Sequence, residues 1–443
     1  MRHGRLLVYA LPAMALAVPL IPAQVLLPSH YADGLGVGLA AVGAVLALAR
    51  FSDVVTDPLI GWLSDHWPSA RLPGFLAGRR KPFIALGAVL GGIALLQLFA
   101  PAGPVGALYL GLWSGLLYLG WTLISIPYAA WGADLSGDYA ERAQLTAWRE
   151  AFGLVGVVLA AALPSALQTL GYGIATALQA VAWVAIAAGA PAILILLWRL
   201  PEPPPLAARR PQADGLRAGL GNRPFRRLLA AWLLNGVANG LPAALVPLFV
   251  EQRLGLGARE LGLLLLVYFM AGLGGLPVWL RLVPRLGKHK VWSIAMMLSC
   301  CAFAGAPLLG AGQVWAFAAI CLLTGATLGA DLALPPAMQA DVVDLDRMRS
   351  GRDRSGLFFA PWGMATKFSL AASVGIAFPL LAWLGFAPGQ ANTAGALFAL
   401  AAIYAWVPVA FKLGAIALVW HHPLTERRQR AIRRRLERRA GIA

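Results

Sequence analysis

The chain has 443 residues, of which 59% are hydrophobic and only 12% are charged. Soluble domains carry about 25% charged residues, so this composition excludes an ordinary soluble protein. The net charge of +17 is concentrated in short segments between apolar runs, which argues against nucleic-acid binding and for a membrane protein.

Apolar stretches of about 20 residues, the length that crosses a bilayer as a helix, recur along the whole chain. The first has no small-residue cleavage site and is interpreted as a span rather than a signal peptide. Together with the loop residues between them, these stretches predict twelve helices near residues 7–27, 36–64, 83–101, 105–131, 146–168, 174–199, 227–250, 258–282, 290–309, 313–340, 356–385 and 391–420. The predicted fold class is an all-α integral membrane protein.

Alternate connections are basic, namely residues 78–82, 208–227, 281–290, 346–354 and 426–439. The connections between them carry almost no basic residues, which is the positive-inside pattern. It predicts that both termini are cytoplasmic and that the chain is a multi-pass protein of a plasma (bacterial inner) membrane. The basic tail can also attract anionic lipid headgroups.

The longest polar insert divides the predicted helices into two groups of six. The predicted organisation is an N-terminal six-helix bundle (1–199), a cytoplasmic linker (200–226), a C-terminal six-helix bundle (227–421) and a basic cytoplasmic tail (422–443). Similar segments, a Trp-Leu pair followed by a turn and a basic cluster, follow the second and eighth helices. This repeat favours two related halves arranged as in major facilitator transporters.

Asp53 and Asp57 lie four residues apart in the second predicted helix, with Thr56 beside them. Side chains at this spacing share a helical face about 5–6 Å apart at Cβ, so the two carboxylates repel unless a cation or proton binds them. A coupling-ion site is the leading interpretation. Pairing with Arg50 or with a lysine of another helix, and a role in substrate binding alone, are the alternatives.

The fourth predicted helix contains four side chains on one broad face: Trp121, Thr122, Ser125 and Tyr128. Thr122 and Ser125 offer neutral oxygens to a cation. Trp121 and Tyr128 are predicted to line a substrate site, although core packing explains aromatic residues equally well.

Four further polar residues in predicted spans are candidates for substrate binding. Arg149, near the start of the fifth helix, either extends to the membrane edge or binds an anion. Asn235 and Asn239 either contact substrate or join helices. Lys367 lies well inside the eleventh span and is predicted to reach Asp53 or Asp57, because an unpaired lysine there is costly.

Charged residues at the predicted cytoplasmic ends of the helices indicate a gate. These candidates are Asp65, Arg79 and Arg80 after the second helix, and Asp341 and Asp344 in the arginine-rich loop after the tenth.

The sequence has no phosphate-binding loop, no Cys/His metal spacing and no nucleophilic serine turn. Cys300, Cys301 and Cys321 lie in apolar segments and are interpreted as inert thiols. An enzyme is therefore not expected, and no cofactor is predicted apart from the coupling ion.

Three stretches together resemble the melibiose permease family, the glycoside–pentoside–hexuronide:cation symporters of the major facilitator superfamily. They are "ARFSDVVTDPLIGWLSD", "GADLSGDYAERAQLTAWREAFG" and "ADVVDLD…GLFFAPWGMATKFSLA". The resemblance implies that Asp53, Asp57 and Thr122 bind the cation, with Thr56 nearby. It likewise implies that Arg149 lies at the sugar site and that Lys367 faces the carboxylates.

The chain departs from the sugar-recognising members of that family at the sugar site. Their helix 1 aspartate is replaced by Ala17, their helix 4 aspartate by Ser125, and the following tryptophan by Ala129. Carboxylates bind sugars by accepting hydroxyl hydrogen bonds, so the main polar groups for a sugar are missing.

The predicted function is secondary active symport of a small organic solute, such as a sugar or glycoside, coupled to Na⁺ or H⁺ through alternating access. If Na⁺ is the coupling ion, its ligands are Asp53, Asp57 and Thr122. An amphipathic or lysolipid-like substrate is the alternative, and a non-transporting membrane sensor or scaffold is a less favoured one. The predicted partners are the substrate and membrane lipid, without nucleic acid, and the protein is expected to be a monomer.

Overall fold

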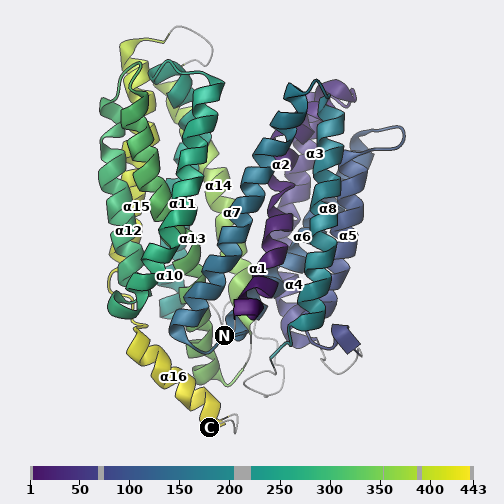
Figure 1. Cartoon of the computed structure of the whole chain (residues 1–443), viewed down its shortest axis with the longest axis vertical. Helices are drawn as coiled ribbons and strands as arrows, with labels where there is room; N and C mark the ends of the chain where they lie inside the picture. Colours follow the sequence, from purple (N-terminus) through teal and green to yellow (C-terminus); the bar gives the residue numbers. More distant parts are fainter. Residues whose placement is uncertain (1–2, 68–73, 204–220, 353, 387–391, 440–443) are drawn as a thin grey trace. The chain divides into compact units, whose positions relative to one another are not determined.

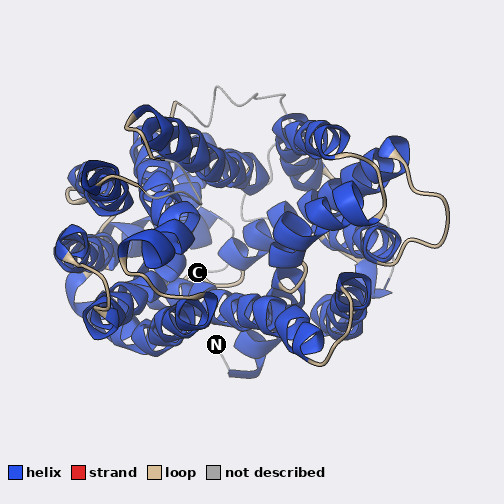
Figure 2. Cartoon of the chain, turned by 90° about the horizontal axis from the view of Figure 1, so that it is seen from above, coloured by secondary structure: helices blue, strands red, loops and turns tan. Residues whose placement is uncertain are grey.

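The computed structural model describes the chain except residues 1–2, 68–73, 204–220, 353, 387–391 and 440–443. All regular secondary structure in the described ranges is helical, and no strand occurs among them (Figure 2). The predicted all-α membrane fold is confirmed.

The chain divides into two compact units, each described here by itself. The first consists of residues 1–216, 343–361 and 432–443, and the second of residues 217–342 and 362–431. Most of the predicted linker, 200–226, lies outside the described residues, and the predicted domain boundaries stay a prediction.

The first unit is built mainly from eight helices (Figure 1). They are α1 (His3–Ala17), α2 (Leu20–Ser29), α3 (Leu39–Phe51), α4 (Asp53–His66), α5 (Lys81–Phe99), α6 (Ala107–Asp134), α7 (Tyr139–Thr169) and α8 (Ile174–Arg199). α1 packs against α7 and α8, and α5 packs against α6. A Cβ atom at Gly87 would lie 2.7 Å from the carbonyl oxygen of Gly120. The α5 and α6 backbones therefore touch directly, as is common where small residues line a helix crossing in a membrane.

The second unit contains the remaining spans. They are α10 (Arg223–Leu248), α11 (Ala258–Leu286), α12 (Lys288–Ala304), α13 (Val314–Ser350), α14 (Ser355–Trp383) and α15 (Ala394–Val419). The last turns of α13 and the first turns of α14 belong to the first unit. In the second unit, α15 packs against α10 and α12, and the Phe249 and Tyr404 rings stack with centroids 4.3 Å apart. Phe303 and Phe317 contact the same tyrosine ring and complete an aromatic core.

Eleven helices among the described residues are long and apolar enough to cross a membrane, one fewer than predicted. The predicted span 36–64 is broken at Ser52 into the shorter helices α3 and α4. The predicted span 7–27 is also interrupted, between α1 and α2, where Pro19 has no N–H to continue the helix. Hydropathy averages over such breaks, so the sequence did not reveal them.

Two predicted helix ends are wrong by several residues. α7 begins at Tyr139 rather than near residue 146, because the Asp138 side chain accepts hydrogen bonds from the backbone N–H groups of Ala140 and Glu141, both at 2.9 Å. Arg149 is therefore well inside this helix rather than near its start. α13 continues to Ser350 rather than ending near 340, so Asp341 and Asp344 are on a helix and not in a loop.

His422 lies in the connection between α15 and α16 (Glu426–Arg439) and is 3% exposed. Burial lowers the pKa of His422 to about 4, and the neighbouring His289 and Arg227 add to this effect. The folded protein therefore keeps this imidazole neutral, whereas an exposed histidine in the unfolded chain has a pKa of about 6.5. Below about pH 6.5 the unfolded chain binds a proton at this histidine that the folded protein does not bind. The free energy of unfolding is therefore highest above about pH 6.5 and decreases as the pH falls toward 4.

We expect acidification from pH 7.5 to 5.0 to cost the wild type about 2 kcal/mol through His422 alone. Thermal unfolding of the purified protein at the two pH values measures this, with His422→Gln expected to show a correspondingly smaller pH-induced decrease in Tm. His421 is exposed, so His421→Gln provides the matched control and should keep the wild-type pH response. Equal pH responses of His422→Gln and wild type would contradict the prediction.

Candidate functional site

The break between α3 and α4 places a carboxylate at the start of a helix inside the first unit. Asp53 is the first residue of α4, and Asp57 follows one turn later on the same face. Asp53 is 4% exposed and Asp57 is 2% exposed. Two buried carboxylates one turn apart are costly in an apolar setting, and this cost falls when a cation or proton is bound.

Thr122 of α6 brings a neutral oxygen to these carboxylates. Its hydroxyl donates a hydrogen bond of 2.8 Å to Asp57 Oδ1, and the threonine side chain is fully buried. A hydroxyl that donates its proton to a carboxylate keeps its lone pairs available to a cation. The structure thus brings together two members of the predicted cation site, Asp57 and Thr122, which are 65 residues apart in the sequence and lie on different helices.

The other predicted members of the cation site are less closely integrated. Thr56 is half-buried, and its hydroxyl has no hydrogen-bond partner among the described residues. Ser125 is half-buried one turn after Trp121 on the same face of α6, and no hydrogen bond joins Ser125 to either carboxylate in the described part of the chain. Their roles stay a prediction.

Tyr128 packs α6 against α1 and is only 4% exposed. Its hydroxyl donates to the Tyr9 carbonyl, and the Tyr9 hydroxyl donates to the Tyr128 carbonyl at 3.3 Å. The two rings lie 4.7 Å apart. These contacts favour the packing interpretation of Tyr128 over the substrate-lining one.

Arg149 is directed toward an acidic neighbour. Its Nη2 atom lies 2.5 Å from Glu150 Oε1, and the Arg149 side chain is 17% exposed. The guanidinium is therefore neutralised within α7, so an anionic substrate group would compete with Glu150 for it.

A buried charged cluster in the second unit, the Asp331 cluster, was missed from the sequence. It consists of Asp331 (α13), Lys412 (α15), Asn235 and Asn239 (α10) and Trp292 (α12). Lys412 Nζ lies 3.0 Å from Asp331 Oδ2 and donates a 2.8 Å hydrogen bond to Asn235 Oδ1. The same carboxylate accepts from Asn239 at 3.2 Å and from the Trp292 indole at 2.6 Å.

The Asp331 cluster bears on the two interpretations of the paired asparagines. Asn235 and Asn239 bind the ion pair and join α10 to α13 and α15, which favours the helix-joining role. The sequence did contain an indication of this cluster, because Asp331 and Lys412 are each the single charged residue in an apolar stretch.

Lys367 lies half-buried on α14 in the second unit. Asp53 and Asp57 belong to the first unit, so the predicted pairing of Lys367 with them stays a prediction.

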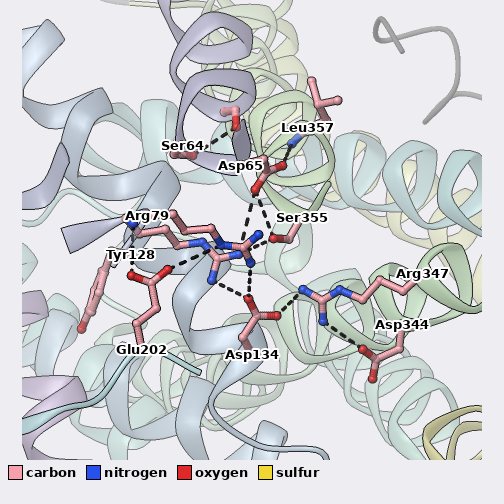
Figure 3. A network of polar contacts seen from close by, with 12 residues as sticks. Ser64, Asp65, Arg79, Tyr128, Asp134, Glu202, Asp344, Arg347, Ser355 and Leu357 are labelled. Atoms are coloured by element: carbon pink, nitrogen blue, oxygen red, sulfur yellow. Dashed lines mark hydrogen bonds and ion pairs between the residues drawn. The ribbon is translucent and has the colours of Figure 1, made fainter. Parts of the chain in front are cut away.

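The predicted gate residues of the first unit form an arginine–carboxylate network (Figure 3). Arg80 is fully buried, and its Nη1 lies 2.5 Å from Asp134 Oδ2, while Arg79 contacts the same oxygen at 3.2 Å. Asp65 accepts from the Leu357 backbone N–H at 3.3 Å, at the start of α14. This carboxylate therefore interacts with the N-terminus of α14, where negative charge is favourable.

Arg347 extends the network to a second carboxylate. It contacts Asp134, and its Nη1 lies 3.2 Å from Asp344. Arg142 reaches the other oxygen of Asp344 at 2.6 Å, and Arg433 of α16 approaches Asp344 at 3.7 Å. Three arginines thus surround each of the two buried aspartates.

Asp341 was predicted to belong to the same group as Asp344, but it forms an ion pair in the second unit. It lies 2.7 Å from Lys288 Nζ at the start of α12, and both side chains are buried. This pair is in the second unit, whereas Asp344 belongs to the first. Neither the Asp134 nor the Arg142 contribution was recognised from the sequence.

The described residues contain no group of three or more His, Cys, Asp or Glu side chains placed to hold a metal ion. A site at Asp53, Asp57 and Thr122 would instead combine two carboxylates with a hydroxyl oxygen, ligands that suit a hard cation.

The model for the family described as MFS/sugar transport protein matches residues 8–426 of the chain. The chain belongs to this family. As an MFS transporter, it has the multi-pass helical architecture described above, and the resemblance to melibiose permease-like symporters is confirmed.

Three relatives of this MFS transporter each cover nine-tenths or more of its length. It is 25% identical to the uncharacterized symporter sll1374 of Synechocystis sp., with 92% of this chain and 91% of the relative covered. It is 24% identical to the human sodium-dependent lysophosphatidylcholine symporter 1 (90% and 79% covered) and to the putative glycoside/cation symporter YagG of Escherichia coli (93% and 90% covered).

Among solved structures, this MFS transporter is similar to an outward-facing bacterial homologue of the iron transporter ferroportin. The TM-score is 0.68 at 17% identity, with 94% of this chain and 98% of that chain covered. At this identity the similarity supports the fold alone.

Proposed function

We propose that the chain is a cation-coupled symporter in which Asp53, Asp57 and Thr122 bind the coupling ion, Na⁺ or H⁺. The observation that carries this proposal is the buried hydrogen bond between Thr122 and Asp57, with Asp53 one turn away. A symporter fits the family, whose model matches residues 8–426.

The coupling follows from electrostatics. Without a bound cation, the two carboxylates repel each other in a region of low dielectric, where charges interact strongly. A bound Na⁺ or proton cancels this repulsion and stabilises the conformations through which the solute is transported across the membrane. The ion therefore changes the relative energies of the states between which an alternating-access transporter moves.

The transported solute is proposed to be a small organic molecule. YagG is named as a glycoside/cation symporter, which supports a glycoside. A second candidate, an amphipathic lysolipid-like solute, is favoured by the packing at Ala17, where sugar-recognising relatives have an aspartate. Ala17 is 6% exposed, and its Cβ would lie 2.8 Å from a Cβ placed at Gly156, so the helix interface is too close for a carboxylate.

The transporter is proposed to act as a monomer in a bacterial inner membrane, with both termini cytoplasmic. The alternation of basic connections supports this orientation. Its partners are then the solute and the surrounding lipid.

Replacing Asp57 by asparagine should abolish coupling, because the substitution removes a charged ligand while keeping the shape of the side chain. We expect apparent cation affinity to fall about 100-fold in Asp57→Asn and about tenfold in Thr122→Val. Cation binding is measured by thermal stabilisation of the purified protein with increasing Na⁺ at constant ionic strength, and separately with decreasing pH. Uptake of a radiolabelled glycoside and of a labelled lysolipid into proteoliposomes measures transport.

Asp138→Asn is a matched control, since it makes the same chemical change at the exposed N-cap of α7 and asparagine also caps helices. It should leave cation binding and uptake unchanged. Wild-type cation-driven uptake by Asp57→Asn would exclude the proposed coupling site.

A further inference from the structure

The C-terminal helix α16 is held close to the end of the last span. Only six residues separate Val419, the end of α15, from Glu426, the start of α16 (Figure 1). Within this connection His422 is 3% exposed and Leu424 is 5% exposed, so the connection is packed against the protein rather than extended away from it. α16 therefore begins near one face of the membrane.

The two sides of α16 differ sharply in exposure. Gln429 and Leu436 are each 1% exposed and pack against the protein. Arg427, Arg434 and Arg438 are exposed. At about 100° per residue, these three arginines lie within about 40° of one another and about 180° from Leu436. The side turned away from the protein is thus an arginine face, defined here as Arg427, Arg434 and Arg438.

The arginine face has no counter-charge in the described part of the protein. None of its three arginines forms a hydrogen bond or ion pair with a described residue. Four other arginines of the helix do have partners: Arg428 with the Pro423 carbonyl, Arg430 with Glu426, Arg433 with Glu437 and Asp344, and Arg439 with the Met348 carbonyl. Arg435 is also exposed and has no partner among the described residues, and it lies about 80° around the helix from Arg427. Three of the four unpaired arginines of this helix therefore lie on the side that is free to meet a partner.

We propose that the arginine face of α16 binds the headgroups of anionic lipids at the membrane surface. Guanidinium groups match phosphate oxygens in charge and in hydrogen-bond geometry. Clustered basic residues directly after a transmembrane helix attract anionic headgroups. Because the apolar side of α16 is already packed against the protein, the helix binds lipid by electrostatics and not by inserting into the bilayer.

The same helix also contacts the arginine–carboxylate network. Arg433 lies 3.7 Å from Asp344 and fills the space beside Gly137, where a Cβ atom would be 2.3 Å from Arg433 Nε. A rigid helix that binds lipid on one side therefore holds Arg433 beside Asp344 on another. Lipid binding is expected to stabilise the docked position of α16, whichever solute the protein transports.

Hydrogen exchange of the full-length protein in lipid nanodiscs tests this proposal. Discs of phosphatidylcholine alone are compared with discs containing one-third phosphatidylglycerol. Amides of residues 426–439 should exchange at least about tenfold more slowly with phosphatidylglycerol. The protection should disappear at about 1 M salt, where the Debye length is ~3 Å.

A variant carrying Arg427→Gln, Arg434→Gln and Arg438→Gln should lose the lipid-dependent protection but keep wild-type exchange in phosphatidylcholine, which shows that α16 remains folded and docked. The matched control replaces the exposed Arg223, Arg281 and Arg285 by glutamine and should retain the protection. Equal exchange in both discs would overturn the proposal. Protection in phosphatidylcholine discs by an added DNA oligonucleotide, without protection by phosphatidylglycerol, would also overturn it and assign the face to a soluble polyanion.

Discussion

Replacing Asp331 by asparagine should lower the free energy of unfolding by about 3–5 kcal/mol. The substitution leaves Lys412 charged and buried without its carboxylate, in a part of the second unit where its side chain is 8% exposed. The Trp292 indole also loses its charged acceptor. The effect is large because the cost is that of an uncompensated buried charge and not merely of one lost contact.

A double-mutant cycle separates these two contributions. Lys412→Met alone should destabilise the protein to a similar extent, while the combined Asp331→Asn and Lys412→Met variant should be much less destabilised than the sum of the two. Reversible unfolding in mixed micelles measures all four proteins. Glu426→Gln, which breaks the exposed Glu426–Arg430 pair, is the control and should change stability by no more than about 0.5 kcal/mol. Additive single substitutions would show that Asp331 and Lys412 do not stabilise each other.

Asp134→Asn should be at least as damaging, with an expected loss of about 3–5 kcal/mol or more. Asp134 accepts contacts from Arg79, Arg80 and Arg347, and all three arginines are at least nine-tenths buried. Asparagine has nearly the same shape as aspartate but carries no charge. Among the contacts described above, Asp134 is the one carboxylate that all three guanidinium groups contact. Among the described residues, their mutual repulsion is then offset only by Glu202, Asp65 and Asp344, each of which contacts one of the three arginines.

The control for Asp134→Asn lies four residues further along the chain. Asp138→Asn makes the same chemical change at an exposed N-cap and should alter stability by about 0.5 kcal/mol or less. Unfolding measured as for Asp331 compares the two variants. A loss of stability in Asp134→Asn no greater than that in Asp138→Asn would contradict the importance assigned to the network.

The sequence predicted the helical membrane fold and most spans, because hydrophobic length is a strong signal. α8 was predicted with the bounds that the structure gives it, Ile174–Arg199. The break at Ser52 was not predicted, since a single serine barely changes average hydropathy. The position of Asp57 beside Thr122 followed from a family resemblance and from helical spacing together.

The Asp331 cluster and the partners of the gate residues could not be predicted in the same way. An isolated aspartate and an isolated lysine in two spans indicate that burying each charge costs free energy. Whether the two side chains form an ion pair depends on which helices pack against each other. Asp344 has arginines close by in the sequence, yet its shortest contact is with Arg142 on α7. Short-range charge patterns therefore indicated one partner of Asp344, Arg347, but not Arg142 or Arg433.

The first unit is formed by segments that are far apart in the sequence, which affects the order in which its parts are synthesised. Residues 343–361 of this unit are synthesised after residues 217–342 of the second unit, and residues 432–443 after all of it. Asp344 emerges about 200 residues after Arg142, which corresponds to roughly 10–40 s of translation. During that interval the nascent N-terminal helices hold an arginine whose buried partner does not yet exist. We therefore expect the buried charges of the first unit to be completed only after α13 is made, and truncated chains lacking α13 to be recognised by membrane quality control as incomplete.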